Sequence, residues 1–355
     1  MSGGGTPLWE VLGKQCVFAY LPQLEPLLAA YCLMERQPVH NLCLEIYGAA
    51  QIEELQRKYR FLFETHEAIS RCTILGALEF LLDVPLQSFR LSAFGDYLLS
   101  QPDEVFLSKY LGGLEASGED WARALTDDEA LDAIYRRNES SLGSFLGFSA
   151  FVRGSGRYRR ELLALAGELN TPELAAAIQA AAPRCTALCE TLRGEIEDLG
   201  ALECSQLHMG KRFRNRGPYE MYYFLPSLLL PARAVRFFPM EPPFTRQILL
   251  LTLREIQSSQ DDTLAALKVL SDKTRYRILI LLAQGTPLRG LDIAKRLQLA
   301  PSTVSHHMDL LKERGLITEE PDGNSKYYGI CSPNLKALLR TLEQDFKLPE
   351  TPPHP

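Results

Sequence analysis

The 355-residue sequence has no uninterrupted apolar run near the ~18 residues that a membrane-spanning helix requires, although apolar residues make up 46% of it. Charged residues account for 23%. This balance is typical of a globular protein and excludes a disordered chain or a collagen-like repeat. Met1 to Pro7 is rich in glycine and lacks the basic and apolar regions of a secretory signal. We therefore expect a cytoplasmic protein with no membrane partner.

The motifs of common catalytic sites are also missing. The chain has no phosphate-binding loop, no nucleotide-binding glycine fingerprint after a strand, no Gly-x-Ser-x-Gly and no His-Glu-x-x-His. Gly154-Ser155-Gly156 lies in a basic segment without a preceding strand. We expect no enzymatic activity and no cofactor.

The eight cysteines do not form a regular disulfide framework, so we expect free thiols. Cys185 and Cys189 are spaced i, i+4, as are Cys204 and His208, and four such ligands would suit zinc. An unbroken helix would hold the two pairs roughly 20–30 Å apart, so only a hairpin near Gly200 would join them. The alternatives are a metal site, a redox thiol pair and buried thiols, of which buried thiols are the default.

The net charge of −6 is unevenly distributed along the chain. Residues 1–267 hold 25 Lys and Arg against 34 Asp and Glu, whereas residues 268–347 hold 13 against 9. An acidic body joined to a basic C-terminal module indicates that only the C-terminal part meets a polyanion.

The first 257 residues predict a large, mainly helical domain. Helices broken by proline and glycine are expected over residues 1–135, and a second helical block from Tyr158 to Leu207. The aromatic segments Tyr219 to Leu230 and Ala234 to Phe238 predict a small β element, and Phe244 to Ile256 predicts another helix. Polar Ser258 to Asp262 is the expected hinge to the next domain.

Two basic runs stand out in this domain. Lys211 to Arg216 could contact DNA phosphates, bind an anionic effector or form a solvated loop, and the loop is the default. Arg157 to Arg160 has the same interpretation.

Residues 263–346 predict a compact module of helices and one hairpin. Helices are expected at 263–271, from the cap Asp272 to 282, at 291–297, at 301–314 and at 333–346. Between the last two, Leu316 to Thr318 and Lys326 to Ile330 flank an Asp-Gly turn and predict a β-hairpin. This order is that of a winged helix-turn-helix.

The 301–314 helix has two distinct faces at 100° per residue. Val304, Met308 and Leu311 fall on one side, with His307 at its margin. Ser302, Thr303, Ser305 and His306 lie on the other side, with Asp309. Short hydroxyls and an imidazole near a helix N-terminus suit base edges in a DNA major groove.

The module resembles the ArsR/SmtB family of bacterial transcriptional regulators. The resemblance rests on the segment from Leu270 to Leu279, on Asp292-Ile293-Ala294, on Ser302 to Met308, on Leu311 to Ile317, and on the hairpin from Gly323 to Tyr328. It implies a homodimer on operator DNA, with Ser302, Thr303, Ser305 and His306 facing bases. Arg275, Lys326 and Tyr327 are then candidates for the phosphate backbone.

The sequence departs from the metal sensors of that family at both of their ligand sites. Their Cys-x-Cys signature falls at Leu288 to Leu291 here, and Asn334 to Phe346 contains no histidine. We therefore expect no bound metal, and residues 1–257 become the expected sensor or dimerisation domain for an unknown non-metal small-molecule effector. The resulting hypothesis is a dimeric repressor; the alternative is a protein-interaction scaffold whose winged helix does not bind DNA.

Overall fold

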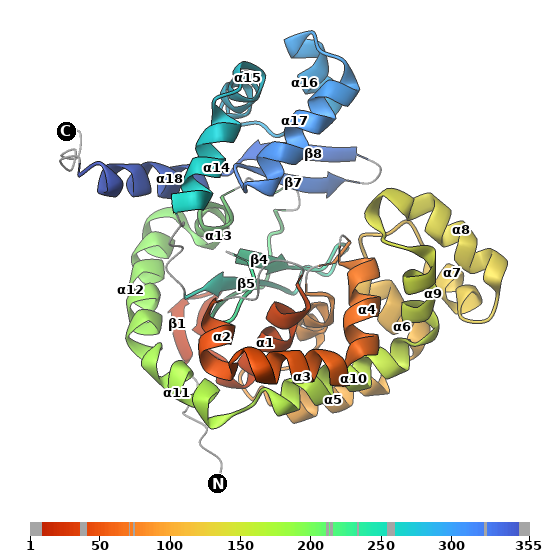
Figure 1. Cartoon of the computed structure of the whole chain (residues 1–355). Helices are drawn as coiled ribbons and strands as arrows, with labels where there is room; N and C mark the ends of the chain where they lie inside the picture. The colour runs from red at the N-terminus through yellow and green to blue at the C-terminus, as the bar shows by residue number, and fades with distance from the viewer. Residues whose placement is uncertain are drawn as a thin grey trace. The chain divides into compact units, whose positions relative to one another are not determined.

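The computed structural model describes residues 9–35, 41–70, 72–73, 75–210, 213, 216–232, 234–253, 260–322 and 325–347. The chain divides into two compact units, one formed by residues 1–194 and 219–253 and the other by residues 195–218 and 254–355. The fold is mainly α, as predicted (Figure 1). Residues 195–218 thus group with the C-terminal part of the chain. The division into functional domains at residues 1–257 and 263–346 stays a prediction. None of the described helices combines the length and apolar content needed to cross a membrane.

The first unit is built on a five-stranded sheet of order β1-β2-β3-β5-β4. β2, β3 and β5 run parallel, and β1 and β4 flank them as antiparallel edges. The strands are β1 Trp9–Gly13, β2 Cys16–Ala19, β3 Met221–Ser227, β4 Ala234–Phe237 and β5 Arg246–Thr252.

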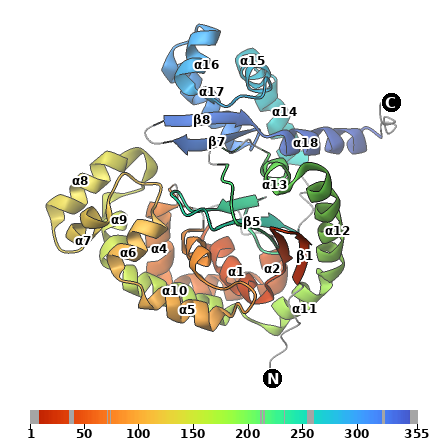
Figure 2. The ribbon, with the colours of Figure 1, turned by 180° about the vertical axis from the view of Figure 1, so that it is seen from behind.

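Helices surround this sheet, and every residue of α1 is buried. In Figures 1 and 2, α1 lies between the sheet and helices α5 and α10. The helical segments are η1 Pro22–Leu24, α1 Glu25–Met34, α2 Asn41–Tyr47, α3 Ala49–Lys58, α4 Arg60–Ile69, η2 Gly76–Asp83, α5 Leu91–Ser100, α6 Asp103–Tyr110, α7 Gly118–Ala124, α8 Asp128–Asn138, η3 Glu139–Ser141, α9 Phe145–Arg153, α10 Ser155–Glu168, α11 Pro172–Ala180 and α12 Ala182–Leu199. The last five residues of α12, 195–199, group with the second unit.

A chain of buried polar side chains links four of these helices. The hydroxyl of Tyr110 lies 3.4 Å from that of Tyr31 and 2.7 Å from that of Tyr158, which in turn lies 2.9 Å from His66 Nδ1. Burial lowers the pKa of His66 to about 4, so its imidazole is neutral near pH 7. The network therefore joins α1, α4, α6 and α10 without a buried charge.

The helix predicted for Phe244 to Ile256 is wrong, because β5 occupies residues 246–252 as an inner strand. Its residues Ile248 to Leu251 are all buried. A strand covered on both faces has a continuous apolar run instead of an alternating one, and a short run of that kind does not distinguish strand from helix. The prediction of helices throughout residues 1–135 fails at β1 and β2 for the related reason that β2 is buried along its whole length.

The small β element is confirmed by β3 and β4, and it proves to be part of the central sheet. Arg157 to Arg160 lie in α10 rather than in a solvated loop. Arg159 is buried and donates to the carbonyls of Leu98 at 3.0 Å and Gln101 at 2.6 Å, and it pairs with the Asp103 carboxylate. Most of the Lys211 to Arg216 run and the start of the Ser258 to Asp262 hinge lie outside the described residues.

The second unit contains the predicted winged helix-turn-helix and the short α13 with the segment that follows it. α15, α16 and α17 pack around a core that includes Ile278, Leu282, Ile293 and Leu311, and β8 pairs with both β6 and β7. Its elements are α13 Ala201–Met209, α14 Gln260–Leu270, α15 Lys273–Leu282, β6 Leu288–Arg289, α16 Gly290–Leu297, α17 Pro301–Glu313, β7 Ile317–Asp322, β8 Ser325–Ile330 and α18 Ser332–Asp345.

Because the whole five-stranded sheet lies before residue 254, we expect a fragment of residues 1–257 to fold alone and melt cooperatively when followed by circular dichroism. A fragment ending at residue 218 lacks β3, β4 and β5 and should not do so. A molten 1–257 fragment would mean that the first unit needs the rest of the chain for its core.

Buried Glu25 makes the stability of the first unit depend on pH. Its carboxylate accepts from the backbone N–H groups of Leu228 at 2.7 Å and Leu229 at 2.9 Å and from the Ser227 hydroxyl at 3.1 Å. Burial outweighs these bonds and raises the pKa of Glu25 from 4.5 to about 7.

The raised pKa means that the folded chain retains a proton that the unfolded chain loses between pH 4.5 and about 7. Wild-type stability relative to Glu25→Gln should therefore fall as pH rises through this window and level off above it. Urea unfolding at a series of pH values measures the difference. The exposed Glu53→Gln on α3 is the control for the loss of one carboxylate; a flat difference for Glu25→Gln would contradict the argument.

Candidate nucleic-acid interface

The orientation of α17 is fixed by three apolar side chains on one of its faces. Val304, Met308 and Leu311 are buried in the core of the winged helix. Because successive residues of a helix are rotated by about 100°, burying this face directs the opposite one outward. The predicted inner face of the helix is confirmed.

The outer face of α17 carries the side chains expected to meet bases. Ser302, Thr303, Ser305 and His306 are all exposed, as is Asp309. The helix starts with Pro301, and Ala300 at the N-cap has no side-chain acceptor for the first N–H groups. These N–H groups and the helix dipole favour an anion such as a phosphate at this end of α17.

His307 has a different environment from His306. Its side chain is 14% exposed, and its Nδ1 lies 3.9 Å from Oδ1 of Asp272. Asp272 caps α15 by accepting the N–H groups of Thr274 and Arg275, both at 2.9 Å. The bond from the Arg275 N–H, helped by nearby positive charge, lowers the pKa of Asp272 despite some desolvation. The side chain of His307 therefore points toward the start of α15 rather than to the outer face of α17.

The three residues expected at phosphates differ in their exposure and in the contacts that they already make. The Arg275 guanidinium donates to the carbonyls of Val269 at 2.6 Å and Lys268 at 3.4 Å, so part of it is engaged at the end of α14. Lys326 is about half exposed, and its Nζ lies 3.3 Å from Oε1 of Glu319. Tyr327, on β8, is partly buried.

Glu319 on β7 connects the hairpin to α17, a link that the sequence did not predict. Its Oε2 lies 3.2 Å from Nζ of Lys312, near the end of α17, while its Oε1 faces Lys326 on β8. Burial opposes ionisation, but the two lysines outweigh it and lower the pKa of Glu319. Only the tertiary structure reveals this arrangement, because it depends on the β7–β8 pairing and on the packing of α17 against β7.

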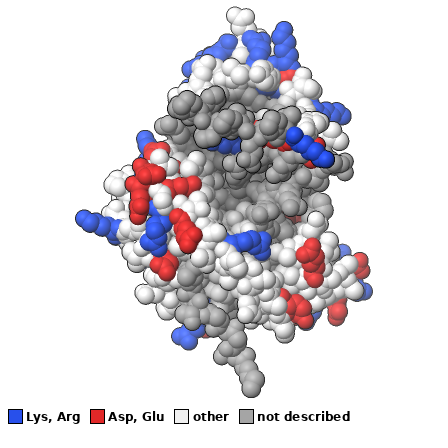
Figure 3. Space-filling view, turned by 90° about the vertical axis from the view of Figure 1, so that its left-hand side faces the viewer, with Lys and Arg blue, Asp and Glu red and all other residues white. Residues whose placement is uncertain are grey.

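The surface charge agrees with a polyanion site on this unit. Figure 3 shows Lys and Arg side chains gathered over the part of the second unit that holds α15 and α16, whereas the first unit shows both signs mixed. On α16, Lys295 and Arg296 are exposed. Part of the basic excess of residues 268–347 therefore lies on α16, which packs against α17.

Residues 270–320 match a family model described as a helix-turn-helix domain. The chain is 42% identical over 77 residues to an arsenical resistance operon repressor from Staphylococcus xylosus, a match that covers 22% of this chain and 73% of the relative. It is 37% identical over 76 residues to an arsenical resistance operon repressor from Staphylococcus aureus, covering 21% of this chain and 72% of the relative. The chain belongs to the ArsR family of transcriptional regulators.

A solved ArsR-like transcriptional regulator from Rhodococcus sp. RHA1 is also similar, at 25% identity and a TM-score of 0.24, over 24% of this chain and 81% of that chain. The matches to ArsR-family relatives each span about a fifth of the chain. They therefore identify the winged helix and do not describe the first unit.

The positions of the metal-sensor ligands named above have other roles in this ArsR-family chain. Leu288 and Arg289 form β6, which pairs with β8, and Gly290 begins α16. The Arg289 guanidinium pairs with Asp292 at 3.0 Å. The sequence did not predict the two-residue strand β6, because so short a strand has no readable pattern.

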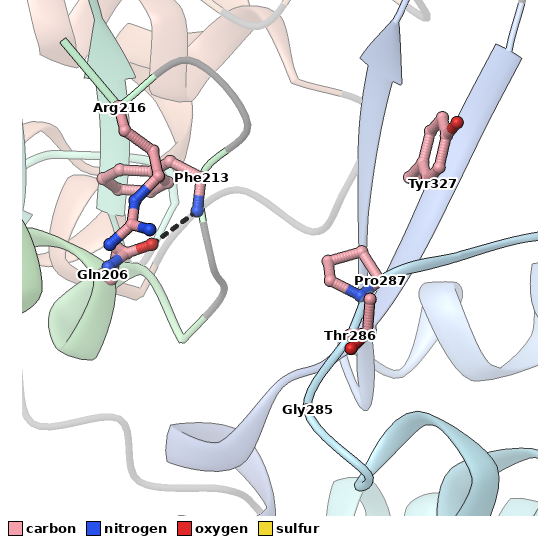
Figure 4. Close-up of a pocket in the computed structure, with 7 residues that line it drawn as sticks. All are labelled: Gln206, Phe213, Arg216, Gly285, Thr286, Pro287 and Tyr327. Carbon is pink, nitrogen blue, oxygen red and sulfur yellow. Dashed lines mark hydrogen bonds between the residues drawn. The ribbon is translucent and has the colours of Figure 1, made fainter.

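A cavity of about 370 Å³ lies in the second unit beside the wing, which is the hairpin of β7 and β8. Tyr327 lines it together with Phe213, Arg216 and the Gly285 to Pro287 turn. Figure 4 shows Gln206, Phe213 and Arg216 on one side of it and Tyr327 with the Gly285 to Pro287 turn on the other, and Gln206 Oε1 accepts the Phe213 N–H at 2.7 Å. The ring of Tyr327 is thus shared between this cavity and the surface of the wing.

The four metal-ligand candidates of the sequence do not all come together. Among the described residues, Cys204 and His208 converge with Glu195, and the group includes neither Cys185 nor Cys189. The sequence contains no signal for Glu195, since α12 carries several acidic residues and their spacing does not mark one of them as a ligand.

Replacing Glu319 tests whether it restrains the cationic wing. In Glu319→Gln, Lys312 and Lys326 lose their shared carboxylate, so random-sequence DNA should bind more tightly. The slope of log K against log salt should steepen by up to about one unit for each additional phosphate that these lysines neutralise. Binding titrations at several salt concentrations measure this. Exposed Glu343→Gln on α18 makes the same charge change elsewhere; equal effects of both variants would show that only net charge matters.

Proposed function

We propose that this ArsR-family protein is a homodimeric transcriptional repressor that reads operator DNA with α17. The observation that carries the proposal is the division of α17 into a buried apolar face and an exposed face bearing Ser302, Thr303, Ser305 and His306. These side chains are of the size and hydrogen-bonding type that read base edges in the major groove. The repressor role is supported by the names of the two staphylococcal relatives.

The dimer is supported by apolar side chains at the ends of the winged helix. Leu264 on α14 is 63% exposed, Leu339 on α18 is 59% exposed, and Phe346 just after α18 is 68% exposed. α14 and α18 pack against each other, so the helices that carry these residues are neighbours. Covering such side chains with a second copy removes apolar area from water.

The wing and the start of α15 would hold the phosphate backbone. Lys326 is the strongest candidate because its side chain is 55% exposed, so a phosphate can compete with the carboxylate of Glu319 for its Nζ. Arg275 and Tyr327 contribute less, because each is partly engaged or buried within the unit.

The first unit would act as the sensor. It has its own sheet and core, which the DNA-binding module does not need, and the winged helix lacks the familiar sensor ligands. A small molecule bound by residues 1–257 would then control operator binding in the cytoplasm. The relatives that match the winged helix have the names of regulators, which supports a regulatory role for the chain over an enzymatic one.

A scaffold whose winged helix binds only protein is the alternative, and operator binding separates the two. A two-fold dimer should protect an imperfect palindrome with half-sites about one turn, 10–10.5 base pairs, apart or a multiple of it. Footprinting across the protein's own promoter region measures this. The absence of any protected site would favour the scaffold.

His306→Ala should weaken operator binding by roughly 1–3 kcal/mol and barely change binding to scrambled DNA, because a base contact is lost. Lys326→Ala is the matched control: it should weaken both alike and reduce the salt slope by about one unit, because a phosphate contact is lost. Titrations on the operator duplex and on a scrambled duplex give the ratio of specific to non-specific affinity. If His306→Ala leaves that ratio unchanged, α17 does not read bases through His306.

A further inference from the structure

The corner between α12 and α13 brings together three side chains of the types that bind metals. Gly200 sits at this corner with φ +78°, a left-handed conformation that glycine adopts without strain. Cys204 and His208 are one turn apart on α13 and so share a face of that helix. The turn at Gly200 sets this face against Glu195 near the end of α12.

The distances between the three groups approach those of a tetrahedral metal site. The ligand atoms all lie within 4.8 Å of one another. His208 Nε2 is 2.5 Å from Glu195 Oε2, and Cys204 Sγ is 3.6 Å from the same oxygen. Ordinary zinc bond lengths at tetrahedral angles place sulfur about 3.6 Å and nitrogen about 3.4 Å from a carboxylate oxygen. The sulfur–oxygen distance already fits, and the nitrogen–oxygen pair must open by about 0.9 Å, which side-chain rotation supplies.

From this geometry we propose that Glu195, Cys204 and His208 bind a zinc ion. The proposal departs from the sequence-based expectation of no bound metal, and it involves neither Cys185 nor Cys189. A thiolate and an imidazole favour zinc over magnesium or calcium, which prefer oxygen ligands alone. Binding releases the Cys204 thiol proton to solvent, and a water molecule completes the fourth position.

The ligands are held in place but remain reachable by an ion. Cys204 is fully buried, whereas the side chains of His208 and Glu195 are 21% and 28% exposed. α13 is tied to the segment after it by the bond from Phe213 N–H to Gln206 and by the Arg216–Glu203 pair at 2.8 Å. Two ligands on an anchored helix lower the ordering cost of binding.

The site lies next to the proposed dimer region of the second unit. α13 packs against α18, which carries the exposed Leu339. An ion bridging α12 to α13 would therefore fix the helix on which α18 rests. The proposal does not depend on operator binding, because its test measures the metal itself.

The test is a cobalt titration of the full-length, reduced protein after metal removal. Co²⁺ takes the place of zinc and reports a bound thiolate through a charge-transfer absorption band. We expect one equivalent of Co²⁺ to produce this band and zinc to abolish it by displacement. Cys204→Ser should lose the band. Glu195→Gln and His208→Gln should weaken binding by more than the about 10- to 100-fold typical of losing an outer-shell partner.

Two variants serve as matched controls, with circular dichroism to confirm folding. Cys189→Ser removes a thiol from α12, and Glu197→Gln removes an exposed carboxylate two residues from Glu195; both should bind cobalt as the wild type does. If Cys204→Ser fails to fold, cobalt binding by the Glu195→Gln and His208→Gln variants decides the result. No thiolate band in the wild type, or a band that survives Glu195→Gln and His208→Gln unchanged, would overturn the proposal.

Discussion

Burial of Val304, Met308 and Leu311 is the constraint on which the functional surface depends. These three side chains occupy the core that α17 shares with α15 and α16, and their positions set the rotation of α17 about its own axis. A rotation that exposed them would cost about 1.5–3 kcal/mol per side chain. Packing against the core thus selects which residues the helix offers to a partner, although none of the packed residues contacts that partner.

Electrostatic contacts connect α17 to its neighbours on either side. Asp272 caps α15 and faces His307, while Glu319 links Lys312 on α17 to Lys326 on the wing. These contacts link α17 to α15 and to the hairpin, and two of the side chains that make them, His307 and Glu319, are only 14% and 21% exposed. The same Glu319 reduces the positive charge of the wing, so positioning of the wing and attraction to phosphate oppose each other at this residue.

The buried elements of the first unit have a different sequence pattern from the helices of the winged helix. Its inner strands and α1 are covered on all sides, so their sequences show continuous apolar character without a readable period. This explains why β5 was predicted as a helix and why β2 was overlooked. By contrast, the helices α14 to α18 each leave one face to solvent. Their apolar residues therefore recur at helical spacing, which made the limits of these helices predictable to within a few residues.

The sequence by itself determined the winged helix-turn-helix, its family and the outward face of α17, because all three depend on local periodicity, caps and a specific run of residues. Tertiary structure alone decided what depends on contacts between distant segments. It joined β3 and β5 into one sheet with β2, engaged Arg275 at the end of α14, and placed Glu319 between two lysines. It also turned α13 at Gly200, so that Cys204 and His208 meet Glu195 and not the other cysteine pair. Such pairings depend on where the chain turns in space, which residue spacing does not encode.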